Sequence, residues 1–466
     1  MIVMKFGGTS VEDAACIERV AEIIRARLHL RPVVVVSAMG KTTRNLLRAA
    51  EASAAGDSST TLDVIGNLKA RHANEARRLV RDAENRQVFK LIERYFDELK
   101  KLLEGLAILG EVPPRGLDKI LAYGELLSSA IVADALLERG IPARLLDSRK
   151  FIITDDRYGA ASPIAELTDL KIQQTVTSVV ESGEVPVIQG FIGSTREGAT
   201  TTLGFEGSDY TAALVGAALN ADDIQIWKDV SGLMTADPAV FRGARTVKVC
   251  SFAEAGELTY FGAKVLHPKA IHPAARKNIA VHIYNSKQPE ATGTFISAAA
   301  PRCANLIKSI AYKRPVTLIH AIPDDGAAES ATSANDFLRS LLLALSRRNL
   351  APLLTAVSAS NVMFAVDSSA LGGGKERDLT EAISAFGKAR IEQGKAIVSL
   401  VGAELRSDSA ATGRVFQAIG EVQPNVILHG SSPIAMSFVV AENEVEPVIA
   451  RLHEVFFNQP DPDVFE

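Results

Sequence analysis

Lys5-Phe-Gly-Gly-Thr-Ser10 decides the fold of the N-terminal part of this chain. It follows a short apolar run and precedes a stretch with helical spacing, so we predict that a strand turns into a helix here. Gly7 and Gly8 let a ligand approach the backbone closely, and we expect Ser10 to cap the helix. The unpaired N–H groups at a helix start attract anions, and Lys5 adds positive charge. This geometry suits a polyphosphate, although a plain helix-capping glycine turn would explain everything except Lys5.

The composition excludes several classes of protein. The 466-residue chain is long enough for two or three domains. Its net charge of −4 argues against a general nucleic-acid binder, which would carry a basic stripe. Its three cysteines lie far apart, which predicts neither a disulfide framework nor a zinc site and fits a reducing compartment. We find no signal-peptide pattern and no apolar run of membrane-spanning length, so we expect a soluble cytoplasmic protein without a membrane partner or a protein-built metal site.

The first 297 residues alternate between strand and helix patterns. Buried strands are predicted at 33–36, 187–189 and 223–227, and helices at 60–82, 87–106, 119–139 and 209–220. This alternation predicts an α/β fold with a mostly parallel sheet sandwiched by helices. Ligands of such folds bind at the carboxyl ends of the strands, which is where Gly7, Gly8, Ser37 and Gly190 fall.

The sequence pattern of alternating strands and helices ends after Thr294. The irregular stretch 297–303 is a plausible linker, and two loosely repeated segments follow it. Each segment reads as a strand, a polar loop, an amphipathic helix and further strands. The first runs from 309 through a helix at 336–347 to 362–366. The second runs from 396 through a helix at 412–420 to 436–440, with a last helix at 445–456. We interpret them as regulatory or structural α+β units, because neither carries a cluster of catalytic residue types.

Three segments place polar groups where a ligand could bind. Ser37-Ala-Met-Gly-Lys-Thr-Thr43 follows a four-valine strand, and its hydroxyls could bind an anion or simply cap the loop. Glu125 lies on a largely apolar helix face, where a carboxylate needs a cation, either a substrate ammonium or an internal lysine. Asp209 follows a glycine- and hydroxyl-rich stretch at an expected helix start. It is either a cap, a partner that orients Lys5 or a ligand of a substrate amine.

Two later segments suit a nucleotide. The stretch 227–238 (WKDVSGLMTADP) follows a strand and contains turn signals. Lys264 lies between apolar residues, so it either reaches water or meets a buried anion. We expect His267, next to a proline, to be structural. Neither 40–42 (GKT) nor 372–375 (GGGK) completes a P-loop, and no GxGxxG follows a predicted strand.

Together these segments resemble the aspartate kinases of the amino-acid-kinase superfamily. The C-terminal repeats resemble that family's paired, ferredoxin-like ACT domains, and 429–432 (HGSS) with 436–440 (MSFVV) fits the second. With no homoserine dehydrogenase appended, the chain is most similar to the monofunctional, lysine-sensitive branch. The matching stretches are KFGGTS at 5–10, VVVSAMGKTT at 34–43, GELLSS at 124–129, QGFIGS at 189–194, TTTLG and GSDYTAA within 200–213, WKDVSGLMTADP at 227–238 and FGAKVLHPKAI at 261–271.

The resemblance implies phosphorylation of the L-aspartate β-carboxylate by ATP with Mg²⁺, which gives 4-phospho-L-aspartate on the way to lysine, threonine and methionine. It implies a catalytic domain at 1–297, a linker and first ACT-like unit at 298–395, and a second at 396–466. It also implies a homodimer or larger assembly and an amino-acid effector. The implied catalytic residues are Lys5, Gly8, Asp209 and Lys264. The implied aspartate-site residues are Ser37, Thr43, Glu125, Phe191 and Ser208. The implied nucleotide-site residues are Lys5, Gly7, Gly8, Lys228, Asp229, Met234 and Lys264.

This chain departs from the family pattern near the substrate. The family commonly has Arg-Gly before Gly-Ser-Asp, where this chain has Phe205-Glu206. That arginine would pair a substrate carboxylate, so we consider Arg157 or Arg196 as replacements. If neither replaces it, the acceptor could be another small amino-acid carboxylate.

Two further departures concern the nucleotide and the effector. The family's Asp-Pro-Arg is Asp-Pro-Ala at 237–239, and Arg242 or Arg245 could compensate. Leu353 and Ala359 stand where the lysine-sensitive branch has effector-binding carboxylates, which leaves lysine, threonine or no effector open. A catalytically weak ACT-based amino-acid sensor is the alternative from another class.

Overall fold

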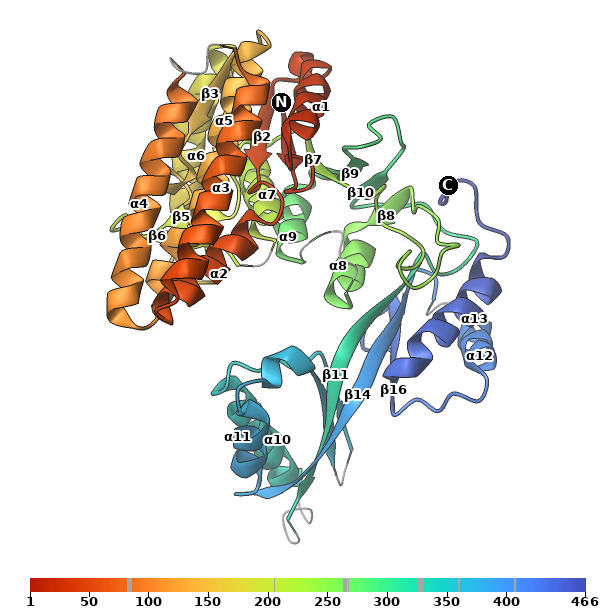
Figure 1. Ribbon diagram of the computed structural model, residues 1–466. Coiled ribbons are helices and arrows are strands. Elements are labelled where there is room, and N and C mark those ends of the chain that lie inside the picture. The colour runs from red at the N-terminus through yellow and green to blue at the C-terminus, as the bar shows by residue number, and fades with distance from the viewer. Residues whose placement is uncertain are drawn as a thin grey trace. The chain divides into compact units, whose positions relative to one another are not determined.

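The computed structural model describes residues 1–466 except 82–85, 205, 263–265, 267, 325–330, 359–360 and 406–407. The chain forms two compact units that interleave along the sequence. The first unit comprises Met1–Leu233, Lys248–Gly256 and Lys264–Ala300, and the second comprises Met234–Val247, Glu257–Ala263 and Pro301–Glu466. The predicted boundaries at 297 and 395 therefore stay a prediction, and each unit is described by itself (Figure 1).

The first unit is built on an eight-stranded sheet in the order β3-β4-β2-β1-β7-β9-β10-β8. Its neighbouring strands are parallel except β9 and β10. Its strands are β1 (Ile2–Phe6), β2 (Pro32–Val36), β3 (Ala143–Leu146), β4 (Val185–Gln189), β7 (Asp223–Lys228), β8 (Val249–Ser251), β9 (Ala280–Asn285) and β10 (Thr294–Ser297), with a separate hairpin of β5 (Ile192–Ser194) and β6 (Thr200–Thr202). Its helices are α1 (Ala14–Arg25), α2 (Thr42–Ala54), α3 (Ser58–Leu79), α4 (Gln87–Leu109), α5 (Pro114–Glu138), α6 (Ala165–Glu181), α7 (Gly207–Ala218) and α9 (Pro268–Lys277), while α8 (Phe252–Tyr260) runs from this unit into the second.

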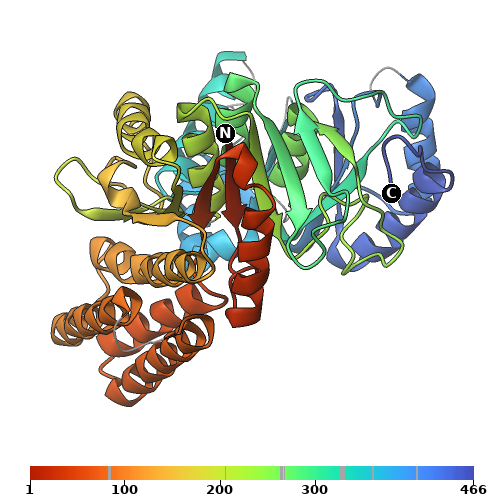
Figure 2. The same ribbon diagram turned by 90° about the horizontal axis from the view of Figure 1, so that it is seen from above.

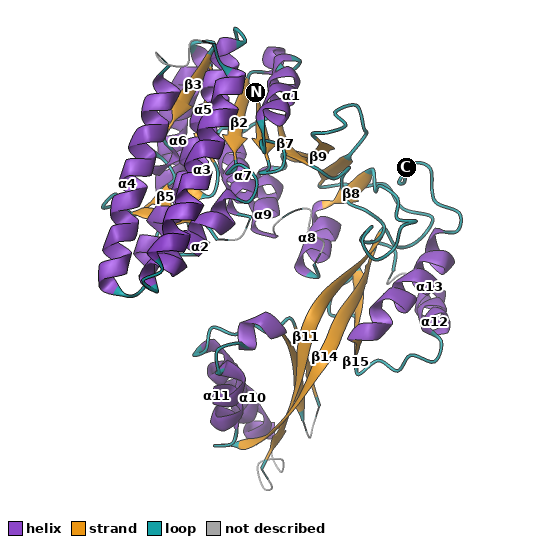
Figure 3. Cartoon of the chain, viewed as in Figure 1, coloured by secondary structure: helices purple, strands orange, loops and turns teal. Residues whose placement is uncertain are grey.

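Helices cover both faces of this sheet. Figure 2 shows the orange helices α2 to α5 on one side of the central strands and the yellow-to-green helices α6 and α7 on the other. Because both faces are covered, β1, β2 and β4 are buried along their whole length. Figure 3 shows the same alternation of strands and helices. The predicted α/β class is confirmed, and α3, α4, α5 and α7 lie where helices were predicted.

The central strands end in register, and this alignment positions the functional site. Phe6 at the end of β1 lies opposite Val36 of β2 and Trp227 of β7, and Val36 lies opposite Gln189 of β4. The residues that follow these strand ends therefore meet at one edge of the sheet. Gly7 N–H continues the pattern by donating to Trp227 O at 3.0 Å.

The expectation that Ser10 caps the first helix is wrong. The helix begins later, at Ala14, and Asp13 is its cap, with its carboxylate accepting from Cys16 N–H at 2.8 Å. Ser10 is buried, and its hydroxyl contacts Trp227 O at 3.2 Å and the Ser286 hydroxyl at 2.8 Å. These partners lie far away in the sequence, so local capping preference could not reveal them.

One helix corrects the expectation that no apolar run is long enough to span a membrane. Among the described residues, α5 alone meets both the length and the hydropathy of such a span. However, 83% of its apolar window is buried inside the protein, as expected of a core helix. Gly124 allows this close packing, because a Cβ at this position would lie 2.9 Å from the Ala38 Cβ.

The second unit contains a six-stranded antiparallel sheet in the order β12-β13-β11-β14-β16-β15. Its strands are β11 (Ser309–Pro323), β12 (Leu354–Val357), β13 (Val362–Asp367), β14 (Gly387–Val401), β15 (Val426–His429) and β16 (Ala435–Ala441). Its helices are α10 (Ala331–Ser346), α11 (Lys375–Ile383), α12 (Ser409–Ile419) and α13 (Val445–Phe457). Figure 3 shows β11 and β14 as two long central strands.

The two long strands each belong to two four-stranded sets. Residues 316–323 of β11 pair with 387–395 of β14 beside β13 and β12, with α10 and α11 as the helices of this set. Residues 309–313 of β11 pair with 397–401 of β14 beside β16 and β15, with α12 and α13. Each set has the ferredoxin-like strand order. The sequence pattern placed 309–313 in the first repeat, whereas this strand segment completes the second set.

Candidate active site

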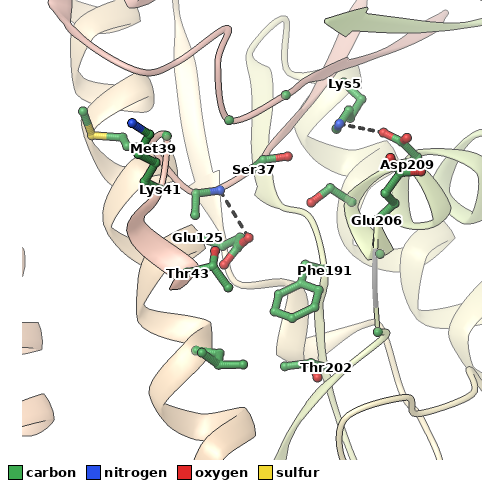
Figure 4. A pocket seen from close by; sticks show the side chains of 18 of the residues that line it. Lys5, Ser37, Met39, Lys41, Thr43, Glu125, Phe191, Thr202, Glu206 and Asp209 are labelled. Carbon is green, nitrogen blue, oxygen red and sulfur yellow. Dashed lines mark hydrogen bonds and ion pairs between the residues drawn. The ribbon is translucent and has the colours of Figure 1, made fainter. Parts of the chain in front are cut away.

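A cavity of about 770 Å³ opens at the carboxyl ends of β1, β2, β4 and β7. It lies entirely within the first unit. Figure 4 shows two chemically different sides, with Lys5, Asp209 and Glu206 on one and Glu125 and Thr43 on the other. Lining residues that the sequence predicted are Lys5, Gly7, Gly8, Ser37, Thr43, Glu125, Phe191, Ser208, Asp209, Lys228 and Asp229. Lining residues that were not predicted as site residues include Thr9, Met39, Lys41, Asp118, Leu121, Thr202 and Glu206.

The first side of the cavity is a cluster of lysines and carboxylates. Lys5 Nζ lies 2.6 Å from Asp209 Oδ1, and Lys228 Nζ lies 2.9 Å from Asp209 Oδ2. The Asp209 side chain is fully buried and stands in the first turn of α7. One carboxylate thus fixes two ammonium groups from β1 and β7 at the N-terminus of a helix, which itself favours anions. Glu206 joins the cluster at 3.6 Å from Lys228 Nζ.

Burial and pairing shift the pKa values within this cluster. Burial disfavours the charged ammonium of Lys5 and lowers its pKa, although Asp209 opposes the shift. Burial also disfavours the Asp209 carboxylate, but the ammonium groups of Lys5 and Lys228 hold its pKa below its usual value. Burial likewise opposes the charge of Lys228, and its two carboxylate neighbours raise its pKa. Pairing thus favours the charged forms of Asp209 and Lys228, whereas burial works against the charge of Lys5.

The other side presents a carboxylate with one unused oxygen. Glu125 is 4% exposed, and its Oε1 accepts from Ala38 N–H at 3.2 Å. Its Oε2 is buried without a hydrogen-bond partner in the part of the chain that the structure describes. Burial raises the pKa of Glu125 to about 8. Such a carboxylate is poised to ionise when a cationic group enters the cavity.

Glycines bring the backbone segments of the site close together. A Cβ on Gly8 would lie 2.8 Å from Ala38 O, and one on Gly190 would lie 2.5 Å from the Ser208 Cβ. The loop after β4 therefore approaches the start of α7 at a distance that only glycine permits. Phe191, the next residue, has a left-handed φ of 67° and lines the cavity.

Two predicted site residues, Lys264 and Met234, are not among the described residues that line this cavity. Lys264 and Phe205 lie outside the described residues, as does His267. Met234 belongs to the second unit, in the segment Met234–Val247, where its carbonyl accepts from the Ser309 hydroxyl at 2.6 Å. The roles assigned to Lys264 and Met234 therefore stay predictions.

The structure does not support the two arginines considered as replacements at the substrate end. Arg157 is largely exposed and pairs with Asp155 at 2.7 Å, and neither it nor Arg196 lines the cavity. Leu353, one of the two positions expected in the effector site, immediately precedes β12, and Ala359 is outside the described residues.

Asp118 is a buried carboxylate of the site that sequence reasoning missed. It stands on α5 and accepts from Gly159 N–H at 3.0 Å, from Thr202 N–H at 2.9 Å and from the Thr202 hydroxyl at 2.8 Å. It thereby joins α5 to the β5–β6 hairpin across the wall of the cavity. Its position about two turns before Glu125 was visible in the sequence, but its partners were not.

The fold and the site define a class of enzyme. A parallel α/β sheet that gathers lysines, glycine-rich turns and a helix N-terminus at its strand ends is suited to phosphoryl transfer between anions, which depends on positioning and charge neutralisation.

Comparisons with known proteins agree with this class. A model of the amino acid kinase family matches residues 1–285, and one of an ACT domain matches residues 398–456. Lysine-sensitive aspartokinase 3 of Escherichia coli is 33% identical, covering 98% of this chain and 99% of the relative. The chloroplastic aspartokinase 1 of Arabidopsis thaliana is 34% identical, covering 98% and 80%.

Solved structures match over the whole chain as well. The crystal structure of E. coli aspartokinase III in complex with aspartate and ADP (R-state) gives a TM-score of 0.89 at 31% identity, covering 98% of this chain and 100% of that chain. The complex with lysine and aspartate (T-state) gives 0.78 at 32% identity, covering 98% and 99%. The chain belongs to the amino acid kinase family and, within it, to the aspartokinases, ATP-dependent enzymes that phosphorylate a carboxyl group of aspartate and carry a C-terminal ACT region.

Proposed function

We propose that the 770 Å³ cavity is where ATP transfers its terminal phosphoryl group to the β-carboxylate of L-aspartate. The observation that supports this proposal is that the two facing sides of the cavity differ in charge and chemistry. Paired lysines at a helix N-terminus suit phosphates, and a partnerless carboxylate oxygen suits the substrate ammonium.

The cluster side receives the phosphates in this proposal. Lys5 and Lys228 neutralise the developing charge, and Asp209 orients both ammonium groups. Gly7 N–H already donates to Trp227 O, so the N–H of the less buried Gly8 is the glycine amide proposed to contact a phosphate. No covalent phospho-enzyme group is needed, since the aspartate carboxylate is itself the nucleophile.

The opposite side receives aspartate. The ionised Glu125 binds the α-ammonium, while hydroxyls of Ser37, Thr43 and Ser208 line the path between the two sides. Ser128, one turn after Glu125, donates to Ser37 O at 2.7 Å and fixes this loop. Phe191 supplies an apolar wall that limits the length of the amino acid.

ATP is proposed to bring its Mg²⁺ with it. The relative's complex contains ADP, which supports nucleotide use. Among the described residues no group of three or more His, Cys, Asp or Glu could hold a metal ion. This donor set fits an ion held mainly by phosphate oxygens and water, which is the usual state of nucleotide-bound Mg²⁺. When bound, the ion would neutralise charge on the triphosphate, and Asp229 is an exposed carboxylate of the lining that could contact it.

Lys228 and Asp229 of the lining contact the nucleotide in this proposal, and the roles of Met234 and Lys264 remain predictions from the family resemblance. We further propose an amino-acid effector at the ACT region, since one relative is named lysine-sensitive. A homodimer or larger assembly and a cytoplasmic location complete the proposal, although other relatives are chloroplastic.

The test is ADP release with Mg-ATP across a panel of amino acids. Turnover with aspartate alone is the expected result. ADP release with a different carboxylic acid would identify that acid as the acceptor. No ADP release with any amino acid of the panel would support the sensor alternative. Adding lysine or threonine to the same assay identifies the effector, and unchanged rates with both would remove the effector proposal.

A further inference from the structure

Glu206 adds a second negative charge to the side of the cavity that carries Lys5, Lys228 and Asp209. It immediately precedes α7, has a left-handed φ of 53° and lines the cavity. Its carboxylate lies 3.6 Å from Lys228 Nζ, and its side chain is only 20% exposed. Burial raises the pKa of Glu206, against the pull of Lys228.

The Glu206 side chain does not cap the helix that follows it. It makes no capping hydrogen bond to the N–H groups of α7. Its left-handed φ suits glycine better than a residue with a Cβ, and the aspartokinases that this chain resembles commonly have glycine here. The side chain is therefore retained in spite of the local backbone preference.

The charges of the cluster balance because of Glu206. Lys5 and Lys228 supply two positive charges, and Asp209 with Glu206 supplies two negative charges. With glycine at 206 the cluster would be positive. A phosphate group that enters here must approach the Glu206 carboxylate and share Lys228 with it, and both effects oppose binding.

We propose that Glu206 competes with the nucleotide phosphates for Lys228 and thereby weakens nucleotide binding by this enzyme. In the free cavity, Lys228 is held by Asp209 at 2.9 Å and by Glu206 at 3.6 Å. The longer contact is the one that a phosphate oxygen replaces, while the shorter contact keeps Lys228 in place. The inference rests on the proposed placement of the triphosphate at Lys5 and Lys228.

The experiment measures ADP binding to the full-length enzyme by calorimetry, with and without Mg²⁺. Glu206→Gln, which keeps the shape and removes the charge, is expected to bind ADP about three- to tenfold more tightly in both conditions. Glu206→Gly should behave in the same way, and Glu206→Asp should stay close to the wild type. Glu104→Gln, which removes an exposed carboxylate on α4 outside the cavity, is the matched control and should leave ADP binding unchanged.

The pH dependence gives a second readout. Lys228 on β7, Asp209 on α7 and Lys5 on β1 are the charged groups that face Glu206. Because acid neutralises Glu206 while these ion pairs persist, the gap in ADP affinity between the wild type and Glu206→Gln should shrink as the pH falls.

Three results would overturn the inference. If Glu206→Gln binds ADP with the same or lower affinity than the wild type, Glu206 does not compete with the phosphates for Lys228. If the ADP affinity of Glu206→Gln falls only when Mg²⁺ is present, Glu206 acts as a metal ligand instead. Circular dichroism of each variant shows whether α7 and the fold are intact, and a pair of unfolded Gln and Gly variants would mean that Glu206 is structural. The proposed function fails separately, if the wild type does not bind ADP or if Lys228→Met leaves ADP affinity unchanged.

Discussion

Aspartate affinity should rise with pH because Glu125 must ionise before it can bind an ammonium group. Its Oε2 is buried and partnerless among the described residues, and burial raises its pKa to about 8 in the empty cavity. Binding of the substrate ammonium to the ionised form therefore releases a proton. The carboxylates and the ammonium group of free aspartate keep their charge between pH 6 and pH 8, so Glu125 is the group that titrates.

The size of the effect follows from the fraction of Glu125 that is ionised. With a pKa of about 8, aspartate should bind about 100-fold more weakly than its limit at pH 6, about 11-fold at pH 7 and about twofold at pH 8. The KM for aspartate should fall accordingly across this range. Calorimetry in two buffers of different ionisation enthalpy should detect close to one proton released per aspartate bound at pH 7.

Glu125→Gln tests the assignment directly. This variant should raise the KM for aspartate and remove its pH dependence, because no carboxylate is left to ionise. Glu166→Gln, an exposed acid in the first turn of α6, is the control and should keep the wild-type profile. A wild-type KM that is flat between pH 6 and pH 8, or a slope that survives in Glu125→Gln, would refute the reasoning.

Three other substitutions test residues that build the site. Lys5→Met should lower kcat by about 10²–10³-fold with the fold intact, since Lys228 still pairs Asp209, and a normal kcat with saturating ATP would contradict its role. Gly8→Ala should abolish ATP binding, because its Cβ would lie 2.8 Å from a backbone oxygen; an active variant with wild-type ATP affinity would show that the turn can move. Asp118→Ala should lower the free energy of unfolding by about 3 kcal/mol, because it leaves the buried N–H and hydroxyl of Thr202 without their acceptor, and denaturation that matches the wild type would disprove this.

The sequence predicted the elements whose signals are local. Runs such as the four valines of β2 are buried on both faces of a parallel sheet, so their hydrophobicity is enough to identify them. Helical spacing likewise located α3, α4, α5 and α7. The site residues after the strand ends followed from a general rule of parallel sheets.

What the sequence could not predict depends on contacts between distant segments. Ser10 has the right type for a helix cap, but its hydrogen bonds to Trp227 and Ser286 draw it into the fold. Asp118 looks like an ordinary helix carboxylate until Thr202 is brought beside it. The segment 309–313 opens the first repeat in sequence, and only the ladder with β14 shows that it completes the second set.

The two unbroken strands β11 and β14 make the regulatory sheet indivisible. Cutting the gene at the predicted boundary 395/396 would sever β14 (Gly387–Val401) and separate 309–313 of β11 from 397–401 of β14, which would leave each as an exposed strand edge. The same two strands run from one set into the other without an intervening loop, so a twist imposed at one end reaches the other through the irregular part of the ladder between Lys313 and Leu318. A ligand that binds to one four-stranded set would in this way change the geometry of the other set.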